Sequence, residues 1–235
     1  MDANANSASY FPNATIVGTD LSPIQPNVVP ENVHFVIDDI SEPDWLYQPH
    51  EYFDYIHIRC MLGAIESYRG LINNSFKYLN AGNGYLECQE WLLDLCCDDD
   101  TLEMQKEYPF RDWIDYAHQS SAEMMNPPRP LRFAHKMKRY MEEVGFVDVH
   151  ERIYKVPLNG WSKDPHLNNL GEWHLNNWLD GLGGFSYGLF GDHGLGWNQT
   201  EIEVFLVGVR KSLQDKNIHV YQKFYVVTGR KPTED

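Results

Sequence analysis

Short apolar segments rich in strand-forming residues alternate with turns and a helical pattern along the first part of the chain. Four such segments occur, at Thr15–Thr19, Val33–Ile37, Phe53–Arg59 and Tyr85–Glu90. Between the last two, apolar residues recur at helical spacing over 71–79, and the glycine turn Asn80–Gly84 ends that helix. Parallel strands need crossover connections, such as a helix between two strands. Strands that are buried on both faces have short, continuous apolar sequences. The pattern therefore predicts an α/β fold built on a parallel sheet.

The second half of the chain carries longer helical patterns and two further strands. Helices are predicted over 101–124, 131–144, 167–182 and 199–215, and strands over 145–157 and 219–232. The acidic cluster Asp98–Asp100 is available as N-cap of the first helix, and the sequence NPPRP separates it from the second. No repeat or low-complexity linker divides the chain, so we expect a single domain over 1–235.

Composition limits the classes of partner. The chain has 235 residues, 43% of them hydrophobic, and a formal net charge of −15. An acidic chain without a basic run is a poor match for a nucleic-acid groove or an anionic membrane surface. The sequence has no N-terminal signal pattern and no apolar stretch of about 20 residues, so we expect neither secretion nor membrane spanning. We therefore expect a cytoplasmic protein, with the nucleus as a second location, and neither nucleic acid nor membrane as partner.

The cysteines are expected to be buried free thiols in a reducing compartment. The four are Cys60, Cys88, Cys96 and Cys97. Adjacent cysteines form a poor disulfide, and none of the spacings is the CxxC of a zinc site. No metal site is predicted.

Five segments are specific when they are taken together. They are GTDLSPIQP (18–26), VHFVIDDISEPDW (33–45), FDYIHIR (53–59), LNAGNGYLECQE (79–90) and IHVYQKFYVVTGRKP (218–232). As a set they resemble the fungal LaeA-like methyltransferases, a class I, S-adenosylmethionine-dependent family of secondary metabolism. The resemblance implies a Rossmann-like class I methyltransferase sheet with helices on both faces, an antiparallel last strand and a helical C-terminal elaboration. It divides the domain into a cofactor half (1–98), a mostly helical substrate region (99–216) and a final strand with tail (217–235).

The resemblance also assigns cofactor contacts by position. Asp20 resembles the acid that accepts hydrogen bonds from the cofactor ribose, a charge-assisted contact, and Leu21 would pack on the adenine. Asp39 resembles the acceptor for the adenine amino group, with Ile40 beside it. Arg59 ends a strand near the place of the methionine part of the cofactor.

Each of these residues also has a structural explanation. Asp20 can cap a loop or a helix start, and Asp38 and Asp39 can form a solvated turn, with the register between the two left open. Arg59 can serve as a structural ion-pair partner. Residue type and position alone do not decide between these interpretations.

The glycine-rich loop of the family is missing from the expected position. That loop should follow a first strand, where glycines let the backbone approach the methionine carboxylate. Residues 1–15 contain no glycine and no apolar run long enough for that strand. We therefore expect an N-terminally truncated or degenerate copy that lacks the first strand and the loop. Two strands should then lose a ladder partner and leave open edges, and binding of S-adenosylmethionine is in question.

A catalytic base is not evident from the sequence. Glu90, His118 and His174 are weak candidates, and His135 and His193 are further histidines in the substrate region. The glycine-rich stretch 181–196 does not follow a strand, so it does not read as a phosphate loop. We expect it to be a mobile loop over the substrate pocket, lined by Phe185, Tyr187, Phe190 and Trp197.

The resemblance implies a methyltransferase of fungal secondary metabolite biosynthesis that acts on an apolar or aromatic small molecule. Two alternatives stay open at this point. The first is a non-catalytic family member that regulates or scaffolds through a protein partner. The second is the same fold used for a natural-product reaction other than methyl transfer.

Overall fold

The computed structural model describes residues 8–23 and 28–233, which fall into two compact units, 1–48 and 49–235. Residues 24–27, which include the last three residues of the GTDLSPIQP motif, lie outside the described residues. The first unit contains β1 (Ile16–Asp20) and β2 (Val33–Ile37), which pair in parallel from Ile16↔Val33 to Asp20↔Ile37. Both strands lie within one residue of their predicted positions.

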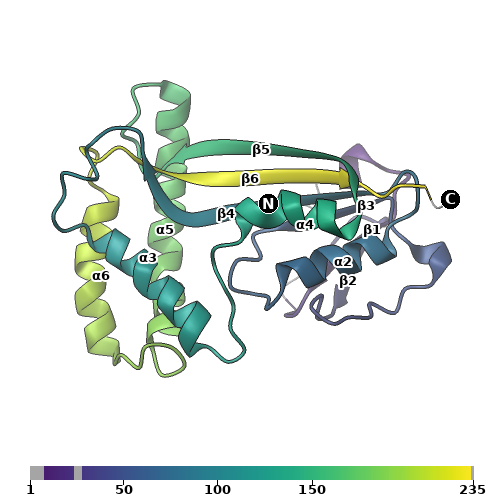
Figure 1. The fold of residues 1–235 in the computed structure, drawn as a ribbon, viewed down its shortest axis with the longest axis horizontal. Helices are drawn as coiled ribbons and strands as arrows, with labels where there is room; N and C mark the ends of the chain where they lie inside the picture. Colours follow the sequence, from purple (N-terminus) through teal and green to yellow (C-terminus); the bar gives the residue numbers. More distant parts are fainter. Residues whose placement is uncertain (1–7, 24–27, 234–235) are drawn as a thin grey trace. The chain divides into compact units, whose positions relative to one another are not determined.

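The second unit is built on a four-stranded sheet in the order β3-β4-β6-β5 (Figure 1). Its strands are β3 (Tyr55–Arg59), β4 (Tyr85–Cys97), β5 (Val147–Pro157) and β6 (Val220–Arg230). β3 and β4 are parallel, whereas β6 runs antiparallel to both of its neighbours, β4 and β5. The predicted antiparallel last strand is therefore confirmed.

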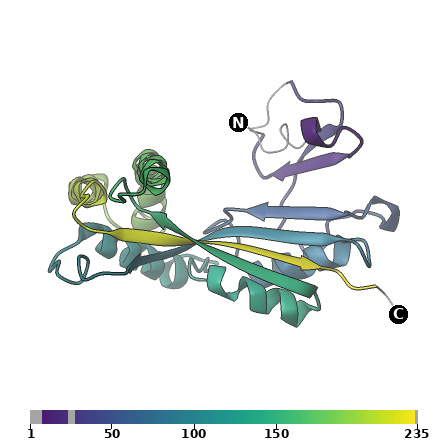
Figure 2. The same ribbon diagram turned by 90° about the horizontal axis from the view of Figure 1, so that it is seen from above.

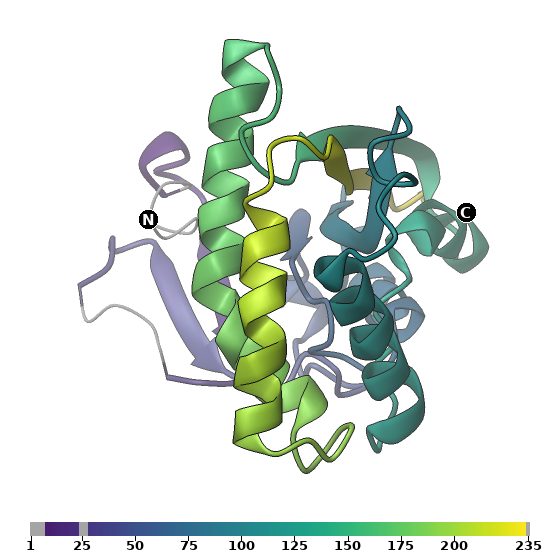
Figure 3. The same ribbon diagram turned by 90° about the vertical axis from the view of Figure 1, so that its left-hand side faces the viewer.

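Helices cover both faces of this sheet. They are α2 (Tyr68–Tyr78), α3 (Pro109–Gln119), α4 (Met137–Val144), α5 (Pro165–Phe190) and α6 (Gln199–Leu213), with short turns η1 (Pro49–Glu51) and η3 (Ala134–Lys136) and the π-helical turn η2 (Ser120–Met124). Figure 2 shows α4 below the sheet and α5 above it. α5 and α6 lie side by side, and α3 packs against both (Figure 3). None of the described helices is both long and apolar enough to cross a membrane.

The sheets have open edges at the predicted place. Among the described residues, β1 pairs only with β2, and β3 pairs only with β4. These are the two strands that, by the resemblance, were expected to lose a ladder partner. That prediction is confirmed for the described residues.

The helix predicted over 101–124 begins later than expected, at Pro109. Asp99 is not a helix N-cap, because its carboxylate accepts hydrogen bonds from the backbone and hydroxyl of Thr101 and contacts His219 Nδ1 at 2.6 Å. These contacts hold the acidic segment as a turn against the start of β6. Proline at the first helical position, where no N–H is needed, then begins α3. Similarly, the helix predicted from residue 131 begins at Met137.

The expected mobile loop over 181–196 is wrong for its first part, because α5 continues to Phe190. Leu182, Ser186 and Phe190 are buried at helical spacing, and Trp113 Nε1 donates to Ser186 Oγ at 2.8 Å. A glycine within a helix costs about 1 kcal/mol relative to alanine. The buried contacts of this helix face offset the cost of the glycines. These contacts come from distant parts of the chain, so a local sequence pattern does not reveal them.

The core of the helical region is aromatic. Phe110 and Trp113 from α3 pack against Trp178 and Phe190 from α5, with ring centroids of Trp113 and Trp178 5.4 Å apart. All four cysteines are free, as expected, but only Cys88 is fully buried and Cys60 is exposed. The expectation of uniformly buried thiols is therefore wrong.

Ser212 joins the ends of α3 and α6. Its hydroxyl accepts a hydrogen bond from Phe110 N at 3.1 Å and donates one to Val209 O at 2.8 Å. Ser212→Ala leaves the buried N–H of Phe110 without a partner, so we expect the free energy of unfolding to fall by about 1–3 kcal/mol in urea denaturation. Ser162→Ala, which removes a hydroxyl that accepts from Asp164 N at the surface, should cost less. Equal losses in the two variants would contradict this interpretation.

Candidate functional site

Asp20 and Asp39 lie at the same edge of the first unit. β1 ends at Asp20, whose register partner Ile37 ends β2, and Asp38 N donates to Asp20 O at 3.2 Å. The carboxyl ends of parallel strands are where ligands bind in folds of this type. The structure therefore brings together the two acids that the resemblance assigns to ribose and adenine.

Both carboxylates also shape their own loops. Asp20 Oδ1 accepts from Ser22 N at 2.8 Å, and Asp39 Oδ1 accepts from Ser41 N and Oγ at 2.9 and 2.6 Å. The turn-forming interpretation is therefore confirmed for each acid, and it is compatible with ligand binding because a carboxylate has several acceptor sites. Cofactor binding by either acid stays a prediction.

The residues of this unit fit the adenosine part of S-adenosylmethionine. Asp20 is exposed at the strand end, Leu21 beside it is 70% exposed, and Asp39 and Ile40 are half-buried in the next loop. An exposed acid and an apolar side chain suit a ribose and a purine, respectively. These residues therefore match the adenosine part of the cofactor, and no described residue of this unit is assigned to its methionine part. Arg59, predicted near the methionine part, ends β3 in the second unit with an exposed side chain.

Glu90 is fully buried in β4 and holds the segment that follows β3. Its Oε2 accepts from Met61 N at 2.7 Å, and its Oε1 accepts from Trp91 N at 2.9 Å. Burial raises the pKa of this carboxyl to about 7, against the opposing effect of the backbone hydrogen bonds. The residues that follow Met61, namely 62–64, line two cavities, whereas Glu90 itself lines neither. Glu90 therefore positions the cavity wall through its hydrogen bond to Met61 N.

The two histidine candidates are engaged in structural contacts. His118 Nε2 lies 2.6 Å from Leu93 O and 3.5 Å from Asp94 Oδ1. His174 is buried, its Nε2 lies 3.0 Å from Gln222 Oε1, and its ring stacks on Trp91. Burial lowers the pKa of His174 to about 4, so this imidazole is neutral near pH 7. Neither histidine lines the two cavities described below.

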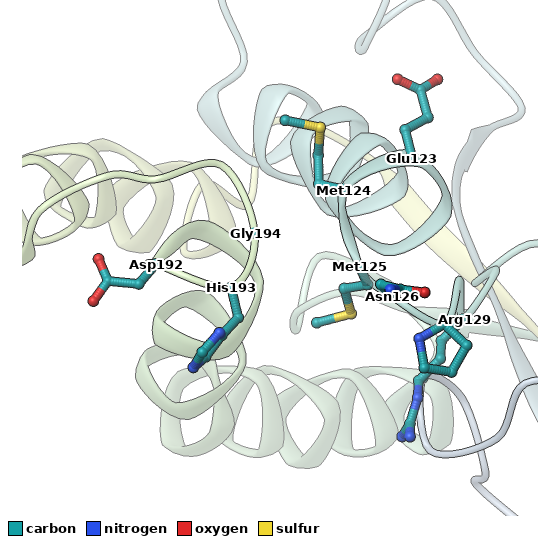
Figure 4. Close-up of a pocket in the computed structure, with 10 residues that line it drawn as sticks. Glu123, Met124, Met125, Asn126, Arg129, Asp192, His193 and Gly194 are labelled. Carbon is teal, nitrogen blue, oxygen red and sulfur yellow. The ribbon is translucent and has the colours of Figure 1, made fainter.

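The larger cavity has a volume of about 640 Å³ and a mixed polar and apolar lining (Figure 4). Its charged or polar side chains are Glu123, Asn126, Arg129, Asp192 and His193. His193, from the loop after α5, lies across the cavity from Met125, which follows η2 (Figure 4). Of the histidines considered as bases, His193 is therefore the one that the structure places in a cavity.

The smaller cavity has a volume of about 370 Å³ and is mostly apolar. It is lined by Leu62, Gly63, Ala64, Leu93, Trp113, Ser121, Met125, Leu131, Trp178, Gly184, Phe185, Gly188 and Leu189. Gly63 and Met125 line both cavities, so the two adjoin each other. Together they form a site beyond the carboxyl end of β3, with an apolar part and a polar part.

Of the four aromatic residues predicted to line a substrate pocket, only Phe185 does so. The hydroxyl of Tyr187 donates to Glu203 on α6, and Phe190 is fully buried in the core. Trp197 packs against the same core. Because the glycine stretch is helical, only one face of it reaches the cavity. The other aromatic walls, Trp113 and Trp178, come from predicted helices whose packing the sequence did not indicate.

The raised pKa of Glu90 predicts a pH-dependent stability. An acid with a higher pKa in the folded state binds more protons when folded, so its contribution is fully present below about pH 4.5 and is lost as pH rises through about 7. Glu90→Gln removes this titration. Between those pH values, the free energy of unfolding of the wild type should fall by about 3 kcal/mol relative to the variant. Chemical denaturation across this pH range measures the difference, and Glu87→Gln controls for removal of a carboxylate from β4. Parallel pH profiles of wild type and Glu90→Gln would refute the assignment.

Comparison with known proteins agrees with the fold. The family described as a methyltransferase domain matches residues 3–151. The chain is 35% identical to methyltransferase pytC of Aspergillus terreus, over 92% of this chain and 64% of pytC. It is 28% identical to the secondary metabolism regulator LAE1 of Cochliobolus heterostrophus, over 97% of this chain and 72% of LAE1.

A solved structure shows the same fold at low sequence identity. It is Haemonchus contortus phosphoethanolamine N-methyltransferase 2 in complex with S-adenosyl-L-methionine, with a TM-score of 0.51 and 14% identity over 97% of this chain and 45% of that chain. Thus the chain spans 64% of the length of pytC and under half of this enzyme. The predicted fold class and the resemblance to LaeA-like proteins are confirmed, and the chain belongs to the methyltransferase-domain family.

Proposed function

We propose that this protein is an S-adenosylmethionine-dependent methyltransferase that acts on an apolar small molecule of fungal secondary metabolism. The observation that carries the proposal is the apolar cavity beyond the carboxyl end of β3, which adjoins a polar cavity holding His193. The similarity to methyltransferase pytC supports the reaction class. Clefts of about 300–1,000 Å³ with a few placed polar groups are typical sites for small molecules.

The bound cofactor supplies a methyl group on a sulfonium, ready for in-line displacement. The chain's own residues would bind the cofactor, orient the acceptor molecule and exclude water from the site. Asp20 would accept hydrogen bonds from the ribose hydroxyls of the cofactor, and Asp39 would accept one from its adenine amino group. The apolar walls of the second unit, among them Trp113 and Trp178, would bind and orient the acceptor, because positioning is the main source of rate enhancement in such a transfer. His193 is the proton acceptor in this proposal, because histidine is the commonest general base and this one lines the more polar cavity.

A regulatory role is the second candidate. The similarity to the regulator LAE1 covers nearly the whole chain. In this alternative the protein retains the fold and acts through a protein partner. We propose the cytoplasm as the location of an enzyme and the nucleus as the location of a regulator.

Calorimetric titration with S-adenosylmethionine tests the first candidate. Asp20→Asn and Asp39→Asn should each weaken binding by about tenfold or more, because each removes a charge-assisted hydrogen bond. Glu31→Gln, an exposed acid that precedes β2 in the same unit, should bind as the wild type does. Lack of binding by the wild-type chain would exclude unassisted methyl transfer. A protein partner retained in a pull-down despite that result would favour the regulator.

A further inference from the structure

Two glycines of α5 face the apolar cavity. Gly184 and Gly188 are four residues apart, so they lie one above the other on the same side of the helix. A methyl group added at either position would meet no protein atom within 4 Å. The backbone of α5 therefore forms a bare wall of the cavity at these two positions.

Packing within the protein does not explain these glycines. At Gly171, by contrast, an added methyl would come within 2.1 Å of Asn159 O, and at Gly194 within 1.7 Å of Leu189 O. Those two positions require glycine because another part of the chain approaches closely. At Gly184 and Gly188 alanine would fit the folded protein and would favour the helix.

The remaining walls of the cavity show what the space can accept. Trp113 Nε1 donates to Ser186 Oγ at 2.8 Å, and Trp178 Nε1 donates to Gln222 Oε1 at 2.9 Å. Both indole N–H groups are therefore satisfied within the protein, and the rings offer apolar surface to the cavity. The hydroxyl of Ser121 likewise donates to His118 O at 3.2 Å. A ligand with few polar atoms in its buried part matches such a lining.

We infer that Gly184 and Gly188 determine acceptor specificity, because they let a planar apolar ring system lie flat against the backbone of α5. Trp113, Trp178 and Phe185 contribute the aromatic walls around that ring system. The polar end of the same molecule extends toward Arg129 and His193 in the adjoining cavity. That the ligand is a methyl acceptor rests on the proposed function, whereas the planar, apolar shape of the ligand rests on the cavity alone.

Gly183 provides a matched control on the same helix. It lines neither cavity, and the only side-chain atom near an added methyl is Tyr187 Cε2, at 4.0 Å. Gly183→Ala, Gly184→Ala and Gly188→Ala should therefore all raise the melting temperature, by roughly 2–4 °C each. Only the last two place a methyl group in the cavity.

Fluorescence titration with N-phenyl-1-naphthylamine, a planar apolar dye that brightens in apolar surroundings, measures binding to the whole chain. The wild type should bind the dye saturably, and Gly184→Ala and Gly188→Ala should each raise Kd by about tenfold or more. Gly183→Ala should leave Kd unchanged. 1-Naphthol should displace the dye better than 1-adamantanol, which is apolar but not planar.

The outcomes separate the inference from the proposed function. Lack of saturable dye binding, unchanged Kd in Gly184→Ala and Gly188→Ala, or equal weakening in Gly183→Ala would overturn the inference. A fall in melting temperature at position 184 or 188 would also overturn it, because it would show that protein packing requires these glycines. Calorimetry with S-adenosylmethionine is independent, because a failure to bind the cofactor removes the proposed enzyme and leaves the dye results unaffected.

Discussion

The hydrogen-bonded ladders on both sides of β6 hold the second unit together. β6 pairs with β4 from Tyr85↔Arg230 to Cys97↔Val220 and with β5 along nearly its whole length. Because β6 is long, it supports β4 well past the end of its parallel partner β3. The extra length of β4 provides the surface on which α3 packs, and β5 provides the surface for α5. Both cavities lie among these elements, beyond the end of β3.

Local sequence patterns predicted the strands better than the helices. β1, β2, β3, β5 and β6 are rich in strand-forming residues with turn residues at their ends, and their predicted positions agree with the structure within a few residues. β4 extends to Cys97, beyond the predicted end at Glu90. The local sequence after Glu90 does not distinguish a strand from other structure, and pairing with β6 keeps these residues in the strand. The start of α3 was predicted too early for a related reason, since Asp99 binds His219 from a distant part of the chain.

The sequence predicted the position of site residues that lie at the end of a single strand. It did not predict the cavity walls, which form where several helices meet. Asp20 is the last residue of β1 and Asp39 lies two residues after β2, so the two acids share a strand-end edge, while their roles toward a cofactor stay a prediction. The cavity walls come from α3, η2, α5 and the segment after β3, and no local pattern indicates which faces of these elements meet. The glycines of α5 led to a wrong prediction as well. Glycine has a low helix propensity, so a loop was predicted, whereas these glycines lie within a helix.

Desolvation between the sheet and its helices works against charge on both sides of β4. It raises the pKa of Glu90 toward neutrality and lowers the pKa of His174, so both groups spend more of their time uncharged than they would in water. The ionisable side chains of the site, Glu123, Arg129, Asp192 and His193, line the more polar of the two cavities instead. In the proposed function, a molecule that spans both cavities would place its apolar part among the apolar walls and its polar part beside these ionisable side chains. The two adjoining cavities therefore separate an apolar lining from ionisable side chains within one site of a strongly acidic protein.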